Sequence, residues 1–461
     1  MNTNTPRSIK IAYIGGGSRF WAHILMNDLA KCPLLTGEVA LYDLNKEMAR
    51  LNQQWGNRIN QSPQARSQWK YTVPPTLPQA LTGADFVIAS IQPGPIEMMD
   101  HDLNIPRKYG IFHTVGDTIG PAGLCRALRA VGDYQEIALA VERFCPKAWV
   151  VNLTNPLTVC TRTLYKVFPQ IKAIGCCHEV FSAQEFLAAL LEEFHGIKAS
   201  REEIRVNVLG VNHFTWIDRA FYTDIDLLKL VDKKMAQKGV VRKISEKEAA
   251  KIGYFGNRKQ VTYDLYQRYG ILPAAGDRHL VEFIPFYTKN EATLHRWGVN
   301  VTPYSYRRDR YKNAPIRSRQ RLADPKPFEL GESGEECVRQ MLAILGLGDF
   351  RSNINLPNVG QVEGLPKDAV VETNAWFSYD SIKPEFAGRL PHAVEALVLR
   401  TVSNQELIIE AALTKNKKLA FQAFLNDPLM SLPTDRAWQM FNQMLNATRS
   451  CLKGWKIQGA T

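Results

Sequence analysis

A strand that runs into a glycine turn and a helix constrains the fold more than any other stretch of this chain. Residues 9–14 form a short β-rich run, and Gly15-Gly-Gly-Ser18 follows at once. Apolar side chains then recur at helical spacing, at Phe20, Trp21, Ile24, Leu25 and Leu29. This order is the context of a dinucleotide-binding fingerprint, because glycines let the backbone approach a pyrophosphate and a helix N-terminus favours its charge. Phe20 occupies the place of the usual third glycine.

This turn and a later carboxylate predict which dinucleotide binds. The predicted binding residues are Gly15, Gly16, Gly17, Ser18, Arg19 and Phe20. A second strand, residues 38–42, ends at Asp43, where an acid can accept hydrogen bonds from ribose hydroxyls and repel a 2′-phosphate. The pattern favours NAD over NADP, although the spacing exceeds the ~20 residues of the usual fingerprint. The alternative is an ordinary strand-end cap.

Strands and helices alternate up to about residue 180. Strand-like runs lie at 85–91, 149–152 and 171–176, with helical patterns at 127–144 and 158–168. This alternation predicts an α/β fold with a Rossmann-like, doubly wound, largely parallel sheet. The alternation ends near residue 220. It is followed by charged helices, by short strands near 352–372 and by long helices from 391 to 452. We therefore predict an NAD-binding domain at 1–200 and a C-terminal α+β domain with long helices at 201–461, which serves catalysis and oligomerisation.

The decapeptide Lys172-Ala-Ile-Gly-Cys-Cys-His-Glu-Val-Phe181 carries the densest reactive chemistry. Cys177 falls at the carboxyl end of a predicted strand, the edge where open α/β sheets bind ligands. A thiolate, an imidazole and a carboxylate in succession suit a borderline-soft divalent metal and proton transfer. His213 follows another predicted strand and is a candidate second ligand. The alternative is a buried pair of thiols beside a surface His-Glu.

Two loops supply further polar candidates. Residues 115–123 form a glycine-rich loop around Asp117, which is either functional or a turn-forming residue. Asn155 lies in an amide-rich turn, where it could bind sugar hydroxyls or cap the next helix.

The net charge of +12 raises nucleic acid as a partner. The basic residues gather densely in one place only, at Arg307, Arg308, Arg310, Lys312, Arg317, Arg319 and Arg321. No nucleic-acid motif accompanies them, so we expect a solvated loop or a subunit contact rather than a polyanion groove. The polar start, the absence of an apolar run near ~20 residues and eight scattered cysteines predict a cytoplasmic protein without a membrane partner.

Jointly, the motifs resemble glycoside hydrolase family 4, the NAD- and metal-dependent glycosidases, which depart from the two-carboxylate scheme. The resemblance rests on Ile14-Gly-Gly-Gly-Ser18, Asp102-Leu-Asn-Ile-Pro106, Gly116-Asp-Thr-Ile-Gly-Pro121, Asn152-Leu-Thr-Asn-Pro156, Cys177-His-Glu-Val180, Gly210-Val-Asn-His213 and Asp277-Arg-His-Leu-Val-Glu282. It implies that Cys177 and His213 bind Mn2+ or a similar ion and that Asn155 touches the sugar. It also implies a homodimer or homotetramer.

The resemblance further implies proton-transfer roles. His178 is the first candidate for the acid, with Asp117 and Asp102 as rivals. A tyrosine in the segment 263–273 would be the base, Tyr269 before Tyr266. NAD+ would take a hydride from C3 of the sugar and the base would remove the C2 proton. The C1 leaving group would then depart, water would add, and the oxidation would be reversed.

The tetrapeptide Cys177-His-Glu-Val180 resembles the α-galacturonidase group of that family. It implies an α-galacturonide substrate, for which the positive charge of the chain is suitable. Glu179 is expected near the substrate, orienting His178 or a metal-bound water, and Arg278 or the basic segment would bind the C6 carboxylate. The alternatives are an α-galactosidase or α-glucosidase of the same family, an NAD-dependent dehydrogenase, and a nucleic-acid-binding Rossmann protein.

Overall fold

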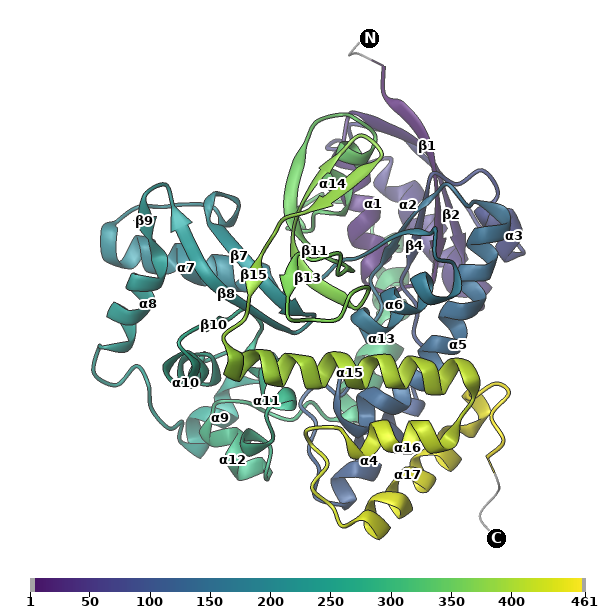
Figure 1. Cartoon of the computed structure of the whole chain (residues 1–461). Coiled ribbons are helices and arrows are strands. Elements are labelled where there is room, and N and C mark those ends of the chain that lie inside the picture. The colour runs from purple at the N-terminus through teal and green to yellow at the C-terminus, as the bar shows by residue number, and fades with distance from the viewer. Residues whose placement is uncertain (1–4, 458–461) are drawn as a thin grey trace.

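The computed structural model describes residues 5–457 and contains the predicted Rossmann-like sheet (Figure 1). Six parallel strands lie in the order β3-β2-β1-β4-β5-β6. They are β1 (Arg7–Ile14), β2 (Leu35–Tyr42), β3 (Trp69–Thr72), β4 (Phe86–Ala89), β5 (Trp149–Asn152) and β6 (Lys172–Gly175). The central strand β4 consists of apolar residues that are all buried, as expected for a parallel strand covered on both faces.

Helices cover both faces of this sheet. One face packs on α1 (Trp21–Lys31), α2 (Lys46–Ile59) and α14 (Cys337–Ile344), and the other on α3 (Leu77–Leu81), α5 (Gly120–Phe144) and α6 (Leu157–Val167). The apolar stripe that predicted α1 is the buried face of that helix, including Leu25 and Leu29. The N-terminus of α1 consequently points at the edge where the parallel strands end.

Three antiparallel strands from the C-terminal half extend the same sheet. They are β11 (Phe350–Pro357), β13 (Val370–Ser378) and β14 (Ser381–Pro384), and β11 pairs with β6. A segment remote in sequence thus completes the sheet. The domain boundary near residue 200 stays a prediction.

A second, smaller sheet stands beside the first (Figure 1). It contains β7 (Arg205–Val211), β8 (Phe214–Tyr222), β9 (Ile225–Asp226) and β10 (Leu272–Pro273). One face packs on α7 (Glu179–His195) and α8 (Leu227–Met235). The other packs on α10 (Gln260–Tyr269), α11 (Asp277–Phe283) and α15 (His392–Thr414).

The long helix α15 connects this core to a helical layer. Its second half packs with α4 (Met98–Lys108), α5, α16 (Lys417–Leu425) and α17 (Thr434–Thr448). The remaining elements are α9 (Glu246–Ile252), α12 (Glu291–Arg296), β12 (Val362–Glu363), β15 (Gly388–Arg389) and the 3-10 turns Arg201–Glu203, Pro285–Tyr287 and Arg449–Cys451. Within residues 5–457, no helix has the length and apolar content that a membrane span requires.

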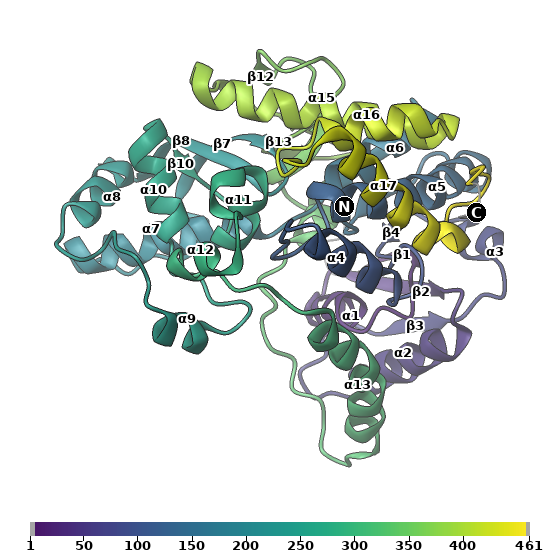
Figure 2. The same ribbon diagram turned by 90° about the horizontal axis from the view of Figure 1, so that it is seen from below.

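The basic segment is a helix, so the expectation of a loop was wrong. Helix α13 (Tyr304–Ala323) lies alongside α2 (Figure 2), and Arg319 pairs with Glu47 across that contact. Dense charge and Pro315 within the segment are typical of loops, and these features hid the helical spacing of its arginines.

Candidate active site

The glycine turn and Asp43 lie side by side at the end of the parallel sheet. Gly15 has φ +88°, and a Cβ there would lie 2.1 Å from the Ser90 carbonyl oxygen, so only glycine fits. The backbone N–H of Gly17 donates to Oδ2 of Asp43 at 2.8 Å. Phe20 caps α1 without a side-chain hydrogen bond and is half exposed. The predicted dinucleotide residues therefore form one contiguous edge.

His213 lies in a two-residue hairpin turn between β7 and β8. Its φ of +65° is left-handed, a conformation that costs a residue with a Cβ about 1–2 kcal/mol. The turn aims the buried imidazole at the end of β6, in the other sheet. Cys177 follows β6 of the large sheet and His213 follows β7 of the small one, so the two candidate ligands come from the strand ends of different sheets.

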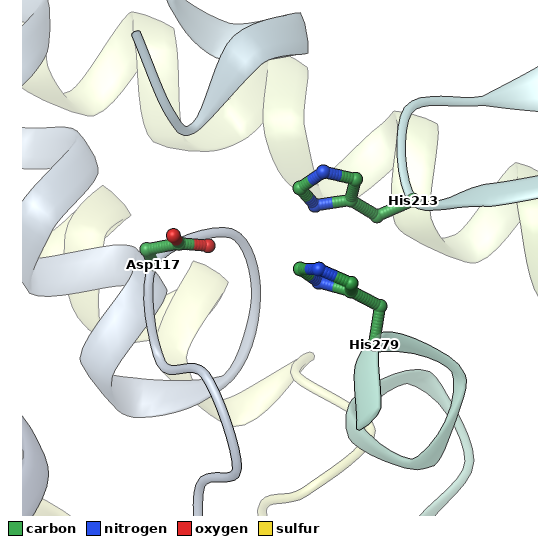
Figure 3. A group of neighbouring side chains, drawn as sticks. All are labelled: Asp117, His213 and His279. Atoms are coloured by element: carbon green, nitrogen blue, oxygen red, sulfur yellow. The ribbon is translucent and has the colours of Figure 1, made fainter. Parts of the chain in front are cut away.

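Three side chains from separate elements converge on one point (Figure 3). Ligand atoms of Asp117, His213 and His279 all lie within 4.8 Å of one another. Asp117 comes from the loop before α5, and His279 from the first turns of α11. His279 was missed by the sequence reasoning, although it is the histidine of the Asp277-Arg-His motif.

Cys177 borders this cluster and a hydrogen-bonded chain supports it. The Cys177 sulfur lies 3.4 Å from Nε2 of His213. Thr118 Oγ1 lies 2.9 Å from Nδ1 of His213 and donates to Asp117 at 2.8 Å. If Nδ1–H donates to the Thr118 hydroxyl, the Nε2 lone pair faces the cysteine. Thr118 thus orients both a carboxylate and an imidazole.

Burial sets the ionisation of the cluster. Burial lowers the pKa of His213 to about 3, so its imidazole stays neutral and keeps a lone pair at physiological pH. Burial alone would raise the pKa of Asp117, but the neighbours His213, His279, Arg126 and Arg307 outweigh it and hold that pKa well below its usual range. Asp117 is consequently an anion with no proton to donate at neutral pH.

Glu179 contacts the cluster through His279. Its Oε2 accepts from the Gly276 N–H at 2.8 Å, and its Oε1 lies 3.4 Å from Nε2 of His279. Burial opposes ionisation of Glu179, yet His279 and the Gly276 amide hold its pKa well below its usual range. Glu179 is paired with His279 and not with His178, the first of its two expected partners, while its role toward a metal-bound water stays a prediction.

A cavity of about 940 Å3 opens over the cluster. Asn155 lines it and donates from Nδ2 to Asp117 at 3.3 Å. His178 also lines it, with Nδ1 3.4 Å from Glu335 Oε1. His178 is exposed, and a hydrogen bond to Glu335 raises its pKa, so this side chain holds a proton more firmly than usual.

The tyrosines predicted as bases lie elsewhere. Tyr269 packs its ring 6.1 Å from that of Trp216, and Tyr266 donates to Asp232 at 3.0 Å. Neither lines the cavity, whereas Tyr306 and Tyr311 of α13 do. Helix α10 packs against the core of the second sheet, so the spacing of its aromatic residues reflects packing. This is why Tyr269 and Tyr266 were wrongly predicted as catalytic bases.

Arginines give the cavity its charge. Arg126, Arg278 and Arg307 line it, and each has a buried guanidinium nitrogen without a hydrogen-bond partner in residues 5–457. Burial lowers the pKa of Arg307 to about 10 against the opposing charge of Asp117. Such unpaired donors match a carboxylate in geometry and sign.

Asp102 does not reach the cavity, so its candidacy as the acid is wrong. It forms two hydrogen bonds to Arg129, at 3.0 and 2.5 Å, and both side chains are 1% exposed. This buried ion pair joins α4 to α5. Asp102 has a structural role.

We expect Asp102→Asn to lower the free energy of unfolding by about 3–5 kcal/mol, because it strands the buried Arg129 charge. Urea unfolding followed by circular dichroism measures the loss. Activity of the folded fraction should stay within threefold of the original. If Asp102→Asn keeps its stability but loses its activity, Asp102 is a catalytic residue after all.

Comparison with known proteins places this site in a family. The model of the family 4 glycosyl hydrolases matches residues 10–193, and that of the family 4 glycosyl hydrolase C-terminal domain matches residues 208–430. An α-galacturonidase of Thermoanaerobacterium saccharolyticum is 48% identical over 456 residues, 98% of each chain. An α-galacturonidase of Bacillus subtilis is 46% identical over 444 residues, 96% of this chain and 98% of the relative.

Solved structures agree with the fold. A proposed glucosidase, lplD of Bacillus subtilis, has a TM-score of 0.89 at 46% identity and covers 95% of this chain and 100% of its own. A 6-phospho-α-glucosidase from gut microorganisms, solved with NAD and Mn2+, has a TM-score of 0.81 at 18% identity and covers 98% and 100%. The latter likeness concerns the fold alone.

Proposed function

The chain belongs to the family 4 glycosyl hydrolases, and we propose that it hydrolyses α-galacturonides with NAD and a divalent metal such as Mn2+. The observation that carries this proposal is the cluster of Asp117, His213 and His279 beneath an arginine-lined cavity. The names of the two α-galacturonidase relatives, which match nearly the whole chain, support the substrate class.

The donor set fits a borderline-soft metal. Cys177 offers sulfur, His213 and His279 offer imidazole nitrogen, and Asp117 offers oxygen, a combination suited to Mn2+, Fe2+ or Zn2+. Burial raises the pKa of the Cys177 thiol, and a bound cation would reverse this by stabilising the thiolate. These residues would hold the ion in our proposal.

The edge of the parallel sheet fits NAD. A Cβ at Gly15, Gly16 or Gly17 would collide with Ser90, Leu41 or Met48, so the glycines permit the tight turn whose backbone would approach a pyrophosphate. Asp43 accepts from the Gly17 N–H and would lie beside the ribose. When bound, NAD+ accepts and returns a hydride while the metal stabilises negative charge on sugar oxygens. The enzyme would therefore hydrolyse its substrate without net oxidation.

The remaining roles fall to side chains in the cavity. Asn155 would bind a sugar hydroxyl, and Glu179 would orient His279. His178 would donate the proton to the leaving group, because its hydrogen bond to Glu335 raises its pKa and favours the protonated form. Tyr306 replaces Tyr269 as the candidate base, because it lines the cavity.

Specificity for a uronide would come from the unpaired arginines. Arg278 directly precedes His279 and bonds to Thr302 through Nη2 at 3.2 Å, which leaves Nε free. It would bind the C6 carboxylate, as would Arg126 or Arg307 beside it. We further propose that the enzyme is a homodimer or homotetramer. All eight cysteines are free, which suits the reducing, cytoplasmic setting that we propose.

A panel of p-nitrophenyl α-glycosides tests this function. We expect rapid release of p-nitrophenol from the α-galacturonide and only a trace from the neutral α-galactoside or α-glucoside. Omitting either NAD+ or Mn2+ after treatment with a chelator should abolish it. Stoichiometric NADH release without glycoside cleavage would instead identify a dehydrogenase.

A further inference from the structure

The loop that carries Asp117 contains no helix or strand. Residues 111–119 lie between α4 and α5 and include both Asp117 and Thr118. Buried backbone N–H groups need hydrogen-bond partners, and a segment outside helices and strands must obtain them from neighbouring elements. The elements that supply these partners therefore determine where the Asp117 carboxylate lies.

Glu282 supplies a partner for two of these N–H groups. It lies on α11 and is 1% exposed. Its Oε1 accepts from the Val115 N–H at 2.8 Å and from the Gly116 N–H at 3.0 Å. Val115 and Gly116 directly precede Asp117. One carboxylate thus fixes the backbone that leads into the residue with which the loop contributes to the cluster.

The same helix carries His279, whereas Asp117 lies on the loop (Figure 3). Glu282 follows His279 by three positions, so both side chains lie on one side of α11. The contact between the loop and the helix extends further, because the Thr114 hydroxyl donates to the Arg278 carbonyl oxygen. Two members of the cluster are thus connected by hydrogen bonds between the loop and α11.

A second buried carboxylate holds the other end of the loop. Asp427 lies between α16 and α17 and accepts from the Gly120 N–H at 2.9 Å and from the Leu429 N–H at 2.8 Å. It belongs to the helical layer and not to an element that carries a cluster residue. Glu282 is therefore the carboxylate that couples the loop to the helix of His279.

We propose that Glu282 is a positioning residue of the metal site, which keeps the Asp117 carboxylate and the His279 imidazole at the separation that one ion requires. This proposal rests on the proposed function, in which both side chains bind the ion. Glu282 does not line the cavity, so it acts through the loop and not on the sugar. Groups that hold metal ligands in place typically contribute about 10–100-fold in metal affinity.

The test compares Glu282→Ala with Asp264→Ala by calorimetric titration of Mn2+ without substrate. For Glu282→Ala we expect Mn2+ binding to weaken about tenfold or more, because two N–H groups lose their acceptor and the loop can move away from α11. An unchanged Mn2+ affinity overturns the proposal.

Asp264 is the matched control, because it is also a buried carboxylate with two donors. It accepts from the Tyr287 hydroxyl at 2.5 Å and from Nε of Arg268 at 2.8 Å, and it does not line the cavity. Asp264→Ala should lose stability in urea unfolding and keep its Mn2+ affinity. An equal loss of Mn2+ affinity in both variants would reduce the effect of Glu282→Ala to stability and overturn the proposal.

Two conservative variants separate position from charge. In Glu282→Gln the amide oxygen can take the place of Oε1 and accept from both N–H groups, so Mn2+ affinity should stay within about threefold of the original. Glu282→Asp keeps the charge but withdraws it by one methylene group, and it should weaken Mn2+ binding. It also replaces Glu282→Ala if that variant does not fold. Loss in Glu282→Gln together with full affinity in Glu282→Asp would refute a positioning role.

Hydrogen exchange of the metal-free protein tests the same contact without the ion. Peptides that cover residues 113–117 should exchange about tenfold faster in Glu282→Ala than in the original protein, the effect of about one hydrogen bond. Asp264→Ala should leave this exchange unchanged. If the original protein binds no Mn2+, the proposed metal role fails, and the exchange still decides whether Glu282 holds the loop. Equal exchange in Glu282→Ala and the original would refute it.

Discussion

His213→Asn is expected to lower kcat/KM on an α-galacturonide by about 10³-fold. Asparagine tolerates the left-handed φ of +65°, so the hairpin should form while the imidazole is lost. Losing a metal that stabilises charge in the transition state costs several kcal/mol, and about 4 kcal/mol corresponds to 10³ in rate. Steady-state kinetics with saturating NAD+ measure the loss, and titration with Mn2+ should show weaker binding.

His195→Asn is the matched control, because that histidine lies exposed at the end of α7. It should leave both kinetics and metal affinity unchanged. NAD+ affinity should be retained in the His213 variant, since the glycine turn lies in the other sheet. Full activity of His213→Asn without added metal would exclude His213 from the metal site.

Arg278→Met should lower kcat/KM on the α-galacturonide by about 10²-fold and leave that on the neutral α-galactoside unchanged. Methionine keeps much of the apolar stem, so the change removes the charge that would pair with C6. Truncating one partner of a buried, hydrogen-bonded charge pair costs about 2–5 kcal/mol. The ratio of the two rates is the measurement.

Arg296→Met provides the comparison, because Arg296 is exposed and lies outside the cavity. It should preserve the ratio of uronide to neutral activity. A proportional fall on both glycosides in Arg278→Met would indicate general damage to the site. The carboxylate partner would then be sought at Arg126 or Arg307.

The N-terminal half of the fold could be predicted because its signals are local. A buried strand, Gly15 at a positive φ and the apolar face of α1 are each encoded by neighbouring residues. The strands that complete the sheet come from residues 350–384. Their pairing with β6 leaves no mark in either segment, so it could not be read from the sequence.

The site shows the same limit. Cys177 and His213 could be identified from strand ends, but their meeting depends on how two sheets are placed. His279 follows Gly276 at the start of a short helix, where sequence spacing carries no metal signature. The aromatic residues of α10 pack in the core, but in the sequence they resembled a stretch that carries a catalytic tyrosine. In α13 the spacing of arginines did contain the signal, which dense charge and Pro315 obscured.

The most direct test of the account is hydrolysis of p-nitrophenyl α-galacturonide in D2O with NAD+ and Mn2+. Oxidation at C3 followed by elimination requires removal and return of the proton at C2 within this cavity. The galacturonate released should therefore carry deuterium at C2, seen by proton NMR as loss of the H2 signal. Hydrolysis at the same rate with hydrogen retained at C2 would contradict it.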